Sequence, residues 1–165
     1  MTAANRHAVF SPDRVYRYTL WRSWDELFGK RYVLFIGLNP STADETTDDP
    51  TIRRCIRFAK QWGYSSMCMC NLFAFRATDP RDMKGCQRPI GPDNDGLIVQ
   101  CARDATLIVA AWGVHGQFMA RDLEVLKLID DVHCLGTTKD GLPKHPLYLA
   151  KTCIPIPYDT EVLAL

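Results

Sequence analysis

The sequence predicts an α/β protein in which helices cover both faces of a parallel sheet. Apolar strand-like runs, such as 32–38 and 66–72, alternate along the chain with segments whose apolar residues recur at helical spacing. The first run is almost continuously apolar, which is typical of a strand buried on both faces. We therefore expect a three-layer α/β/α sandwich around a four-stranded parallel sheet.

The expected elements follow one another without a stretch that would suggest a linker. Residues 7–10 and 15–21 are β-prone and flank a Ser-Pro-Asp turn, which predicts an N-terminal β-hairpin. Strands and helices then alternate over residues 32–38, 49–63, 66–72, 91–105, 106–111, 116–130 and 132–135. We expect a single domain over 1–165, in which residues 1–30 form the hairpin extension.

The helix expected over 49–63 has well-defined ends. Asp49 suits the N-cap position, Pro50 suits the first turn, and Gly63 ends the helical pattern. Right-handed crossovers place all four carboxyl ends at one edge of the sheet, for which we expect the strand order 2-1-3-4. Ligands of such sheets bind beyond those carboxyl ends, so the loops there are the first candidates for a site.

Composition excludes several classes of protein. The chain has 165 residues, 47% hydrophobic and 24% charged, and a formal net charge of +1. These values are typical of a globular protein, and a net charge this small gives no overall positive field that would attract nucleic acid. Residues 51–88 are rich in Lys and Arg, which predicts either a phosphate-binding patch or a solvated helix face. No signal peptide and no apolar run of about 18 residues is found, so we expect a cytoplasmic protein without a membrane segment.

The seven cysteines predict buried thiols and no bound cofactor. Their number is odd, most lie in apolar contexts, and no CxxC spacing occurs. Paired ligand spacings of that kind are the usual sign of a structural metal site. We therefore expect all seven thiols to be reduced and free of metal.

The loop after the first parallel strand, residues 37–50, carries the densest set of polar candidates. Gly37 permits close backbone approach and Pro40 fixes the bend. Asn39 can orient a water molecule or bind a base edge, and Asp44 can activate water. Ser41 and Thr42 can bind a phosphate or a sugar; the alternative is a turn and a helix cap alone.

Two neighbouring segments add candidates for base and phosphate binding. Asn71 ends a buried strand, where a polar side chain needs a specific partner. Phe73 can stack on a base, or can belong to the core. Arg53 and Arg54 lie at a helix start, where the helix dipole favours an anion.

The last two loops each carry a histidine. His115 lies at a strand–helix junction beside Trp112, a candidate pocket wall, and we expect a structural or capping role for this histidine. Lys144 and His145 lie together in a Gly/Pro-rich loop, and Pro146 keeps His145 extended. A histidine in this position can donate a hydrogen bond to a developing anion, or can simply belong to a loop.

Several motifs resemble known families. The segments LFIGLNPSTAD, NLFAFRATDP and TKDGLPKHPLYL, together with DDPTIRRCIRFAKQWGY, are similar to domain-of-unknown-function family 1643 (DUF1643). GLNPS, the strand-end Asn71 and KHPLYL also resemble the motifs of the uracil-DNA glycosylase superfamily over residues 31–150. The second resemblance implies a uracil-DNA glycosylase-like fold.

The superfamily resemblance implies roles for particular residues. Asn39 would position water, Asn71 would read the base edge, and His145 would stabilise the departing base. Asn39 stands where the most active members have an aspartate. Cys86 and Cys101 resemble the second cysteine pair of cluster-bearing members, but the first pair is absent, so we expect no iron–sulfur cluster.

The expected partner is a nucleic acid or a free nucleotide, and two classes of function remain open. In the first, the protein binds a nucleobase and hydrolyses or modifies it, with Asn39, Asp44 and His145 as catalytic candidates. In the second, the chain is a non-catalytic nucleotide or nucleic-acid binding module that kept the pocket and lost hydrolysis.

Overall fold

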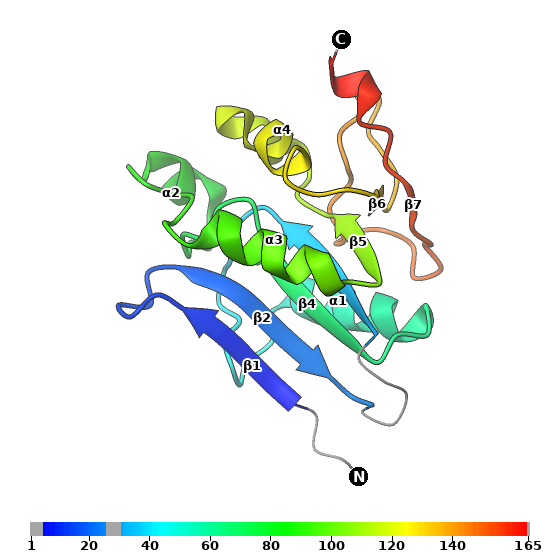
Figure 1. The fold of residues 1–165 in the computed structure, drawn as a ribbon, viewed down its shortest axis with the longest axis horizontal. Coiled ribbons are helices and arrows are strands. Elements are labelled where there is room, and N and C mark those ends of the chain that lie inside the picture. Colours follow the sequence, from blue (N-terminus) through cyan, green and yellow to red (C-terminus); the bar gives the residue numbers. More distant parts are fainter. Residues whose placement is uncertain (1–4, 26–30, 165) are drawn as a thin grey trace.

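A computed structural model describes residues 5–25 and 31–164 and shows a mixed α/β fold (Figure 1). Within these residues, one seven-stranded sheet has the order β1-β2-β4-β3-β5-β6-β7. The strands are β1 (Asn5–Phe10), β2 (Arg17–Ser23), β3 (Tyr32–Gly37), β4 (Ser66–Asn71), β5 (Leu107–Ala110), β6 (Val132–Cys134) and β7 (Ile156–Pro157). The helices are α1 (Pro50–Gln61), α2 (Pro80–Gly85), α3 (Asn94–Asp104), α4 (Arg121–Leu126) and the 3-10 segments η1 (Val114–Ala120) and η2 (Glu161–Ala164).

The centre of the sheet consists of the four strands that the sequence predicts. Strands β4, β3, β5 and β6 are neighbours in that order and pair in parallel. A sheet of four parallel strands is nevertheless not confirmed, because the sheet is larger and mixed. β1 and β2 extend it by antiparallel pairing at one edge, and β7 does so at the other. This pairing covers backbone groups that β4 and β6 would otherwise leave open.

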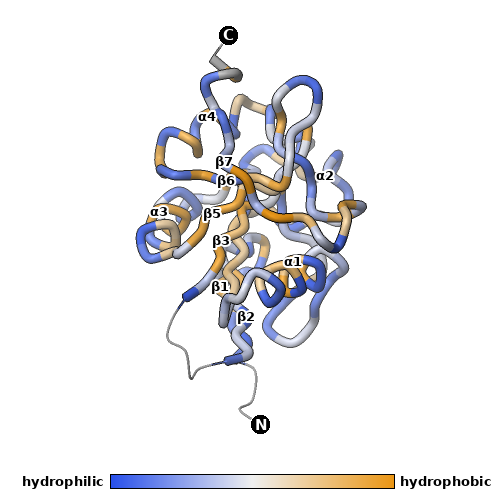
Figure 2. Tube along the Cα trace, turned by 90° about the vertical axis from the view of Figure 1, so that its right-hand side faces the viewer, coloured by the Kyte–Doolittle hydropathy of each residue, from blue (hydrophilic) through white to orange (hydrophobic). Residues whose placement is uncertain are grey.

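Two helical layers bury the two faces of the sheet. The apolar side of α1, including Ile52 and Phe58, packs with Val33 and Phe35 on one face. On the other face, Ile98 of α3 and Val125 of α4 pack in a cluster with residues of β3, β4 and β5. Figure 2 shows α1 and α3 on opposite sides of the hydrophobic central strands. β3 is therefore buried along its whole length, as its apolar run predicts.

The ends of α1 agree with the sequence, whereas the last predicted helix does not. The Asp49 side chain accepts the backbone N–H of Ile52 at 2.8 Å, which caps α1. The single helix predicted over 116–130 is wrong, because the chain turns at Met119 and Ala120, whose φ angles are 59° and 53°. The turn lets the buried Arg121 donate to the carbonyl oxygen of Leu72 at 2.8 Å.

The N-terminal hairpin is present and forms one edge of the sheet. β2 pairs with β1 and with β4, so the hairpin belongs to the sheet that carries the core. Parts of the predicted extension, residues 1–4 and 26–30, lie outside the described residues.

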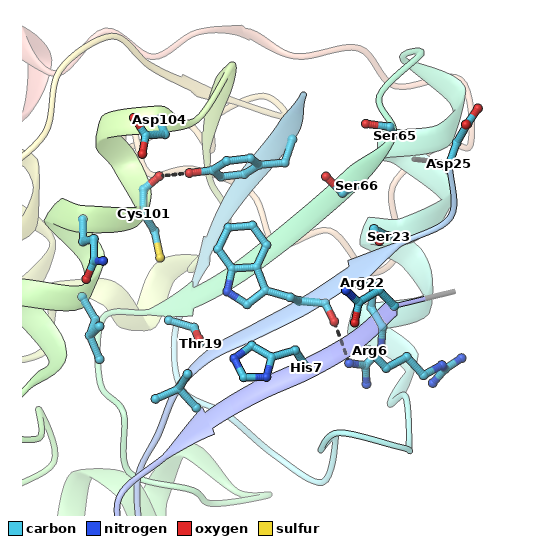
Figure 3. A pocket seen from close by; sticks show the side chains of 16 residues that line it. Arg6, His7, Thr19, Arg22, Ser23, Asp25, Ser65, Ser66, Cys101 and Asp104 are labelled. Carbon is cyan, nitrogen blue, oxygen red and sulfur yellow. Dashed lines mark hydrogen bonds between the residues drawn. The ribbon is translucent and has the colours of Figure 1, made fainter. Parts of the chain in front are cut away.

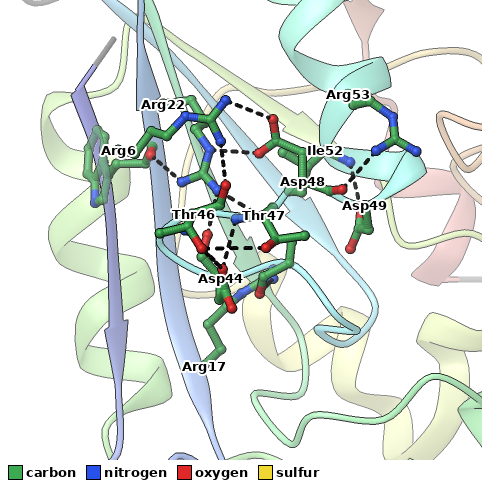
Figure 4. Close-up of polar contacts among 12 residues, drawn as sticks. Arg6, Arg17, Arg22, Asp44, Thr46, Thr47, Asp48, Asp49, Ile52 and Arg53 are labelled. Atoms are coloured by element: carbon green, nitrogen blue, oxygen red, sulfur yellow. Dashed lines mark hydrogen bonds and ion pairs between the residues drawn. The ribbon is translucent and has the colours of Figure 1, made fainter. Parts of the chain in front are cut away.

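Arginine side chains of this hairpin hold the acidic segment 43–48 (Figure 4). The buried Arg22 donates to the Asp48 carboxylate at 2.8 Å and to the carbonyl oxygens of Asp44 and Thr47. Arg6 also contacts Asp48, at 3.4 Å. The acidic residues before α1 therefore fix this loop against the hairpin.

Replacing Arg22 by Ala should destabilise the protein strongly. The change removes the hydrogen bonds from Arg22 to the Asp48 carboxylate and to the carbonyl oxygens of Asp44 and Thr47, which should lower the free energy of unfolding by roughly 3 kcal/mol. Urea denaturation measures this loss. Arg14→Ala is the matched control, because Arg14 joins the hairpin to the same segment through the exposed Glu45 and should change stability little. Equal losses in both variants would contradict the proposed anchoring role of Arg22.

Candidate functional site

A cavity of about 500 Å³ lies at the carboxyl edge of the central parallel strands. Residues of the loops after β3, β4 and β5 line it, together with the start of α1 and His145 of the loop after β6. The four loops that the sequence places at this edge therefore meet around one cavity. Its volume falls within the range of roughly 300–1,000 Å³ that is usual for small-molecule sites.

Gly37 and Asn71 form the base of this cavity at the ends of two paired strands. The two residues are directly opposite each other in the parallel pairing of β3 with β4. A Cβ atom on residue 37 would lie only 2.8 Å from Oδ1 of Asn71. Glycine is therefore required here for the Asn71 amide to keep its position. The sequence predicts a close approach at Gly37, and in the structure the approaching group is a side chain of the protein itself.

Three residues that line this cavity each have a buried donor atom without a hydrogen-bond partner among the described residues. These atoms are Nδ2 of Asn71, Nε1 of Trp112 and Nε of Arg17. Their side chains are buried, with exposed fractions of 3%, 1% and 2% respectively. A buried donor without an acceptor costs free energy, so such groups are rare unless a ligand or water completes them. The arrangement suits a ligand that presents hydrogen-bond acceptors.

Arg17 adds positive charge to the cavity. Its Nη1 donates to the carbonyl oxygen of Ala43 at 2.9 Å, which leaves Nε as the unpaired donor. Burial lowers the pKa of Arg17 to about 10, and the nearby Asp49 opposes this shift. The guanidinium therefore stays charged at neutral pH. Sequence reasoning missed Arg17, because an arginine in a hairpin strand looks like a solvent-exposed residue.

Asn39 is held by the loop that follows β4. Its Nδ2 donates to the carbonyl oxygen of Ala77 at 2.8 Å and to that of Pro40 at 3.2 Å. These two bonds fix the orientation of the amide. None of the hydrogen bonds among the described residues involves Oδ1, so this oxygen can accept a bond from a ligand or water.

His145 lies in the cavity as a neutral donor. Its Nδ1 accepts the backbone N–H of Leu147 at 3.2 Å, which places the proton of the neutral ring on Nε2. Burial lowers the pKa of His145, and the negative charge of Asp49 partly opposes this effect. The neutral form therefore persists below the pH at which an exposed histidine becomes charged.

The carboxylate in the cavity is Asp49 and not Asp44. Asp44 does not line the cavity. Its carboxylate accepts the N–H groups of Thr46 and Thr47 at 2.9 and 2.8 Å, and these bonds lower its pKa to about 2. The prediction that Asp44 activates water is therefore at odds with its place in this turn. Asp49 lines the cavity, and sequence reasoning identified it only as a helix cap.

The other candidates divide into residues of the cavity and residues outside it. Pro40, Ser41 and Thr42 line the cavity, as the sequence predicts for this loop. Residues outside the cavity lining are Arg53, Arg54, Phe73 and Lys144.

Each of these four residues makes contacts elsewhere in the fold. Phe73 is fully buried and packs against Phe118, so its ring belongs to the core. Arg53 donates to the carbonyl oxygen of Asp48, and Arg54 lies over the ring of Phe58 on the same helix. Lys144 is exposed, and its backbone N–H donates to Gly136.

A second, larger cavity of about 1250 Å³ lies at the opposite edge of the sheet (Figure 3). It is lined by the hairpin, by the first residues of β3 and β4, and by the end of α3. The smaller cavity is the stronger candidate site, because the ligand-binding edge of a parallel sheet is the carboxyl edge. The three residues with unpaired donors also line the smaller one.

Replacing Gly37 by Ala should displace the Asn71 amide and lower the free energy of unfolding by roughly 1–3 kcal/mol. Chemical denaturation of a double-mutant cycle tests the cause. When Asn71 is also changed to Ala, the clash disappears, and the combined loss should be smaller than the sum of the single losses. Gly96→Ala is the control, since a Cβ there meets open space. Strict additivity in the cycle would show that Gly37 and Asn71 do not interact.

None of the helices in the described part of the chain is long and apolar enough to cross a membrane.

No curated protein and no solved structure matches the chain. A family model described as "Protein of unknown function (DUF1643)" matches residues 17–147. The matched segment begins at Arg17 and ends at Leu147, both of which line the cavity, and so contains its whole lining. The chain therefore belongs to the DUF1643 family.

Proposed function

We propose that the cavity at the carboxyl edge binds a nucleobase, and that the protein hydrolyses or modifies that base in a nucleic acid or nucleotide. The observation that carries this proposal is the set of unpaired buried donors on Asn71, Trp112 and Arg17. The edge of a nucleobase presents carbonyl oxygens and ring nitrogens, which accept hydrogen bonds from such donors. The charge of Arg17 also favours an anionic form of the ligand or a nearby phosphate.

The walls of the cavity support a flat, partly apolar ligand. Leu38, Pro40, Met69 and Trp112 supply apolar surface beside the polar groups. Small-molecule sites typically combine such a lining with a few placed donors and acceptors. A base taken out of a nucleic-acid stack needs this combination, because its faces are apolar and its edge is polar.

We further propose that the fold is uracil-DNA glycosylase-like. The support is the position of the three residues on which the motif resemblance depends. Asn39, Asn71 and His145 are far apart in the sequence, and all three line the same cavity. A shared base-binding site would require this convergence.

Hydrolysis of an N-glycosidic bond can be written with groups of this cavity. Asn71 donates to the base edge, and Oδ1 of Asn39 orients a water molecule. Asp49 accepts the proton that water loses as its oxygen bonds to the sugar carbon. The bond between that carbon and the base nitrogen breaks, and the base leaves as an anion. The neutral His145 donates a hydrogen bond from Nε2–H to that anion, which finally takes up, through solvent, the proton that Asp49 accepted.

The alternative is a binding module without catalysis, and one observation favours it. Asp49 already uses one oxygen to cap α1, and the motif position holds Asn39, which cannot accept a proton from water. A pocket with these constraints can bind a base without activating water.

One experiment separates the enzyme from the binding module. The protein is incubated with duplexes that carry uracil, hypoxanthine or 5-hydroxymethyluracil, and alkali-labile abasic sites are measured. Calorimetry with the same duplexes and with free nucleotides measures binding. Strand breaks after alkali support hydrolysis, and binding without breaks supports the module or a base-modifying activity. The proposal is refuted if the protein shows no binding and produces no strand breaks with any of these ligands.

Replacing Trp112 by Phe should weaken ligand binding about fivefold without destabilising the protein. The change removes the Nε1–H donor and keeps most of the ring, so one hydrogen bond to the ligand of about 1 kcal/mol is lost. The free protein loses a donor that has no partner among the described residues, so its stability should hold or rise. Calorimetry with the tightest-binding ligand and thermal denaturation measure the two effects.

The matched control for this variant is Trp62→Phe. Nε1 of Trp62 donates to the carbonyl oxygen of Cys153 at 3.0 Å, and Trp62 does not line the cavity. This variant should therefore lose stability and keep its affinity. If Trp62→Phe loses affinity and Trp112→Phe keeps it, the ligand binds outside this cavity.

Replacing Asp49 by Asn should lower turnover by roughly 100-fold or more and leave the fold intact. Asn caps a helix about as well as Asp, but it cannot accept a proton from water. Single-turnover kinetics on the duplex substrate measures the effect, with binding measured separately. Asp44→Asn is the control and should keep its turnover. If Asp44→Asn loses turnover and Asp49→Asn does not, the assignment of the carboxylate is wrong.

A further inference from the structure

Three thiols that sequence reasoning treats as separate come together on one face of the sheet. Cys68 and Cys70 lie two residues apart on β4, so their side chains point to the same face. Cys101 lies on α3, which packs on that face. The three sulfur atoms lie within 4.8 Å of one another.

One of the three sulfur–sulfur distances matches the coordination of a small thiophilic ion, and the other two are at most 4.8 Å. The distance between Sγ of Cys68 and Sγ of Cys101 is 3.9 Å. Zinc–thiolate bonds of about 2.3 Å separate two sulfur ligands by roughly 3.8 Å in tetrahedral geometry and by roughly 4.0 Å in trigonal geometry. An ion could therefore bind between the thiols with little movement of the backbone.

The elements that carry the thiols are fixed before any ion binds. β4 pairs with a neighbour on each side, which holds Cys68 and Cys70 in register. The hydroxyl of Tyr32 on β3 donates to the carbonyl oxygen of Cys101 and ties α3 to the sheet. Preformed ligands lose little conformational entropy on binding, which favours affinity.

The larger cavity gives an ion a path to the cluster. Cys101 lines this cavity, beside the edge-to-face pair of Trp21 and Tyr32. Figure 3 shows the Cys101 sulfur directed from α3 toward the sheet. An ion or a further small ligand can therefore approach Cys101 from the cavity, although Cys68 and Cys70 are fully buried.

We propose that Cys68, Cys70 and Cys101 bind one thiophilic d¹⁰ metal ion, Zn(II) or Cu(I), through three thiolates. Soft sulfur ligands select these ions over hard cations such as magnesium. The site is independent of the proposed base-binding cavity. It also departs from the expectation of seven metal-free thiols, which depended on the absence of CxxC spacing. Ligands from a strand and from a helix 31 positions further on leave no such local signal.

Metal titration of the full-length protein tests the proposal. Reduced, metal-stripped protein is titrated with Zn(II), and separately with Cu(I), against a competing chromophoric chelator. We expect uptake of one equivalent per chain for at least one of these ions. Cys101→Ser should weaken that binding by roughly 100-fold or more, because one of three ligands is lost. Cys55→Ser is the control and should bind as the wild type does, because Cys55 is a buried thiol on α1, on the other face of the sheet.

A second measurement on the wild type keeps the proposal testable if a variant fails to fold. X-ray absorption at the edge of the bound metal should show three sulfur neighbours at about 2.3 Å. Uptake below one equivalent for both ions would overturn the proposal. A metal coordination shell without sulfur would also overturn it, as would a folded Cys101→Ser variant whose metal affinity is unchanged.

Discussion

The contact between Gly37 and Asn71 is the constraint on which the candidate site depends. A strand that is buried on both faces normally ends in side chains that fill space, but β3 ends in a residue without one. Because Gly37 has no side chain, the amide of Asn71 fits beside its backbone. Oδ1 of Asn71 lies only 2.8 Å from the position that a Cβ atom on residue 37 would occupy. The pairing of β3 with β4 brings the loops after both strands to one edge. Backbone bonds then continue the pairing past the strand ends, from Leu72 to Gly37 and from Phe73 to Leu38.

The hairpin completes this edge from the far side of β4. Arg22 and Arg6 bind the segment 43–48 and set where α1 begins, since Asp49 follows that segment directly. Arg17 reaches from the same strand as Arg22 to Ala43 and lines the cavity. The dense acidic and threonine content before α1 thus has a structural explanation, because it provides acceptors for the hairpin. A nucleotide phosphate is not needed to account for it.

The sequence predicts what local patterns determine. Four central strands lie within one residue of their expected bounds, and the cap of α1 is confirmed, because burial, capping and turn chemistry act over a few residues. Convergence of Asn39, Asn71 and His145 follows from the crossover rule, which needs only the order of the elements. Long-range contacts leave no such trace. The pairing of β2 with β4, the burial of Arg17 and the meeting of Cys101 with Cys68 each depend on residues more than 25 positions apart.

Asp49 illustrates why a local reading can be correct and still miss a site. Its Oδ1 accepts the N–H of Ile52, which is the role that its position before Pro50 predicts. This bond also fixes the side chain, and none of the hydrogen bonds among the described residues involves Oδ2. The cap alone does not require a charge, because Asn would serve it equally well. The carboxylate acts on groups beyond the helix, since it raises the pKa of both Arg17 and His145 against the effect of burial. The charge of Asp49, which the helix does not need, therefore acts on two other side chains of the cavity, Arg17 and His145.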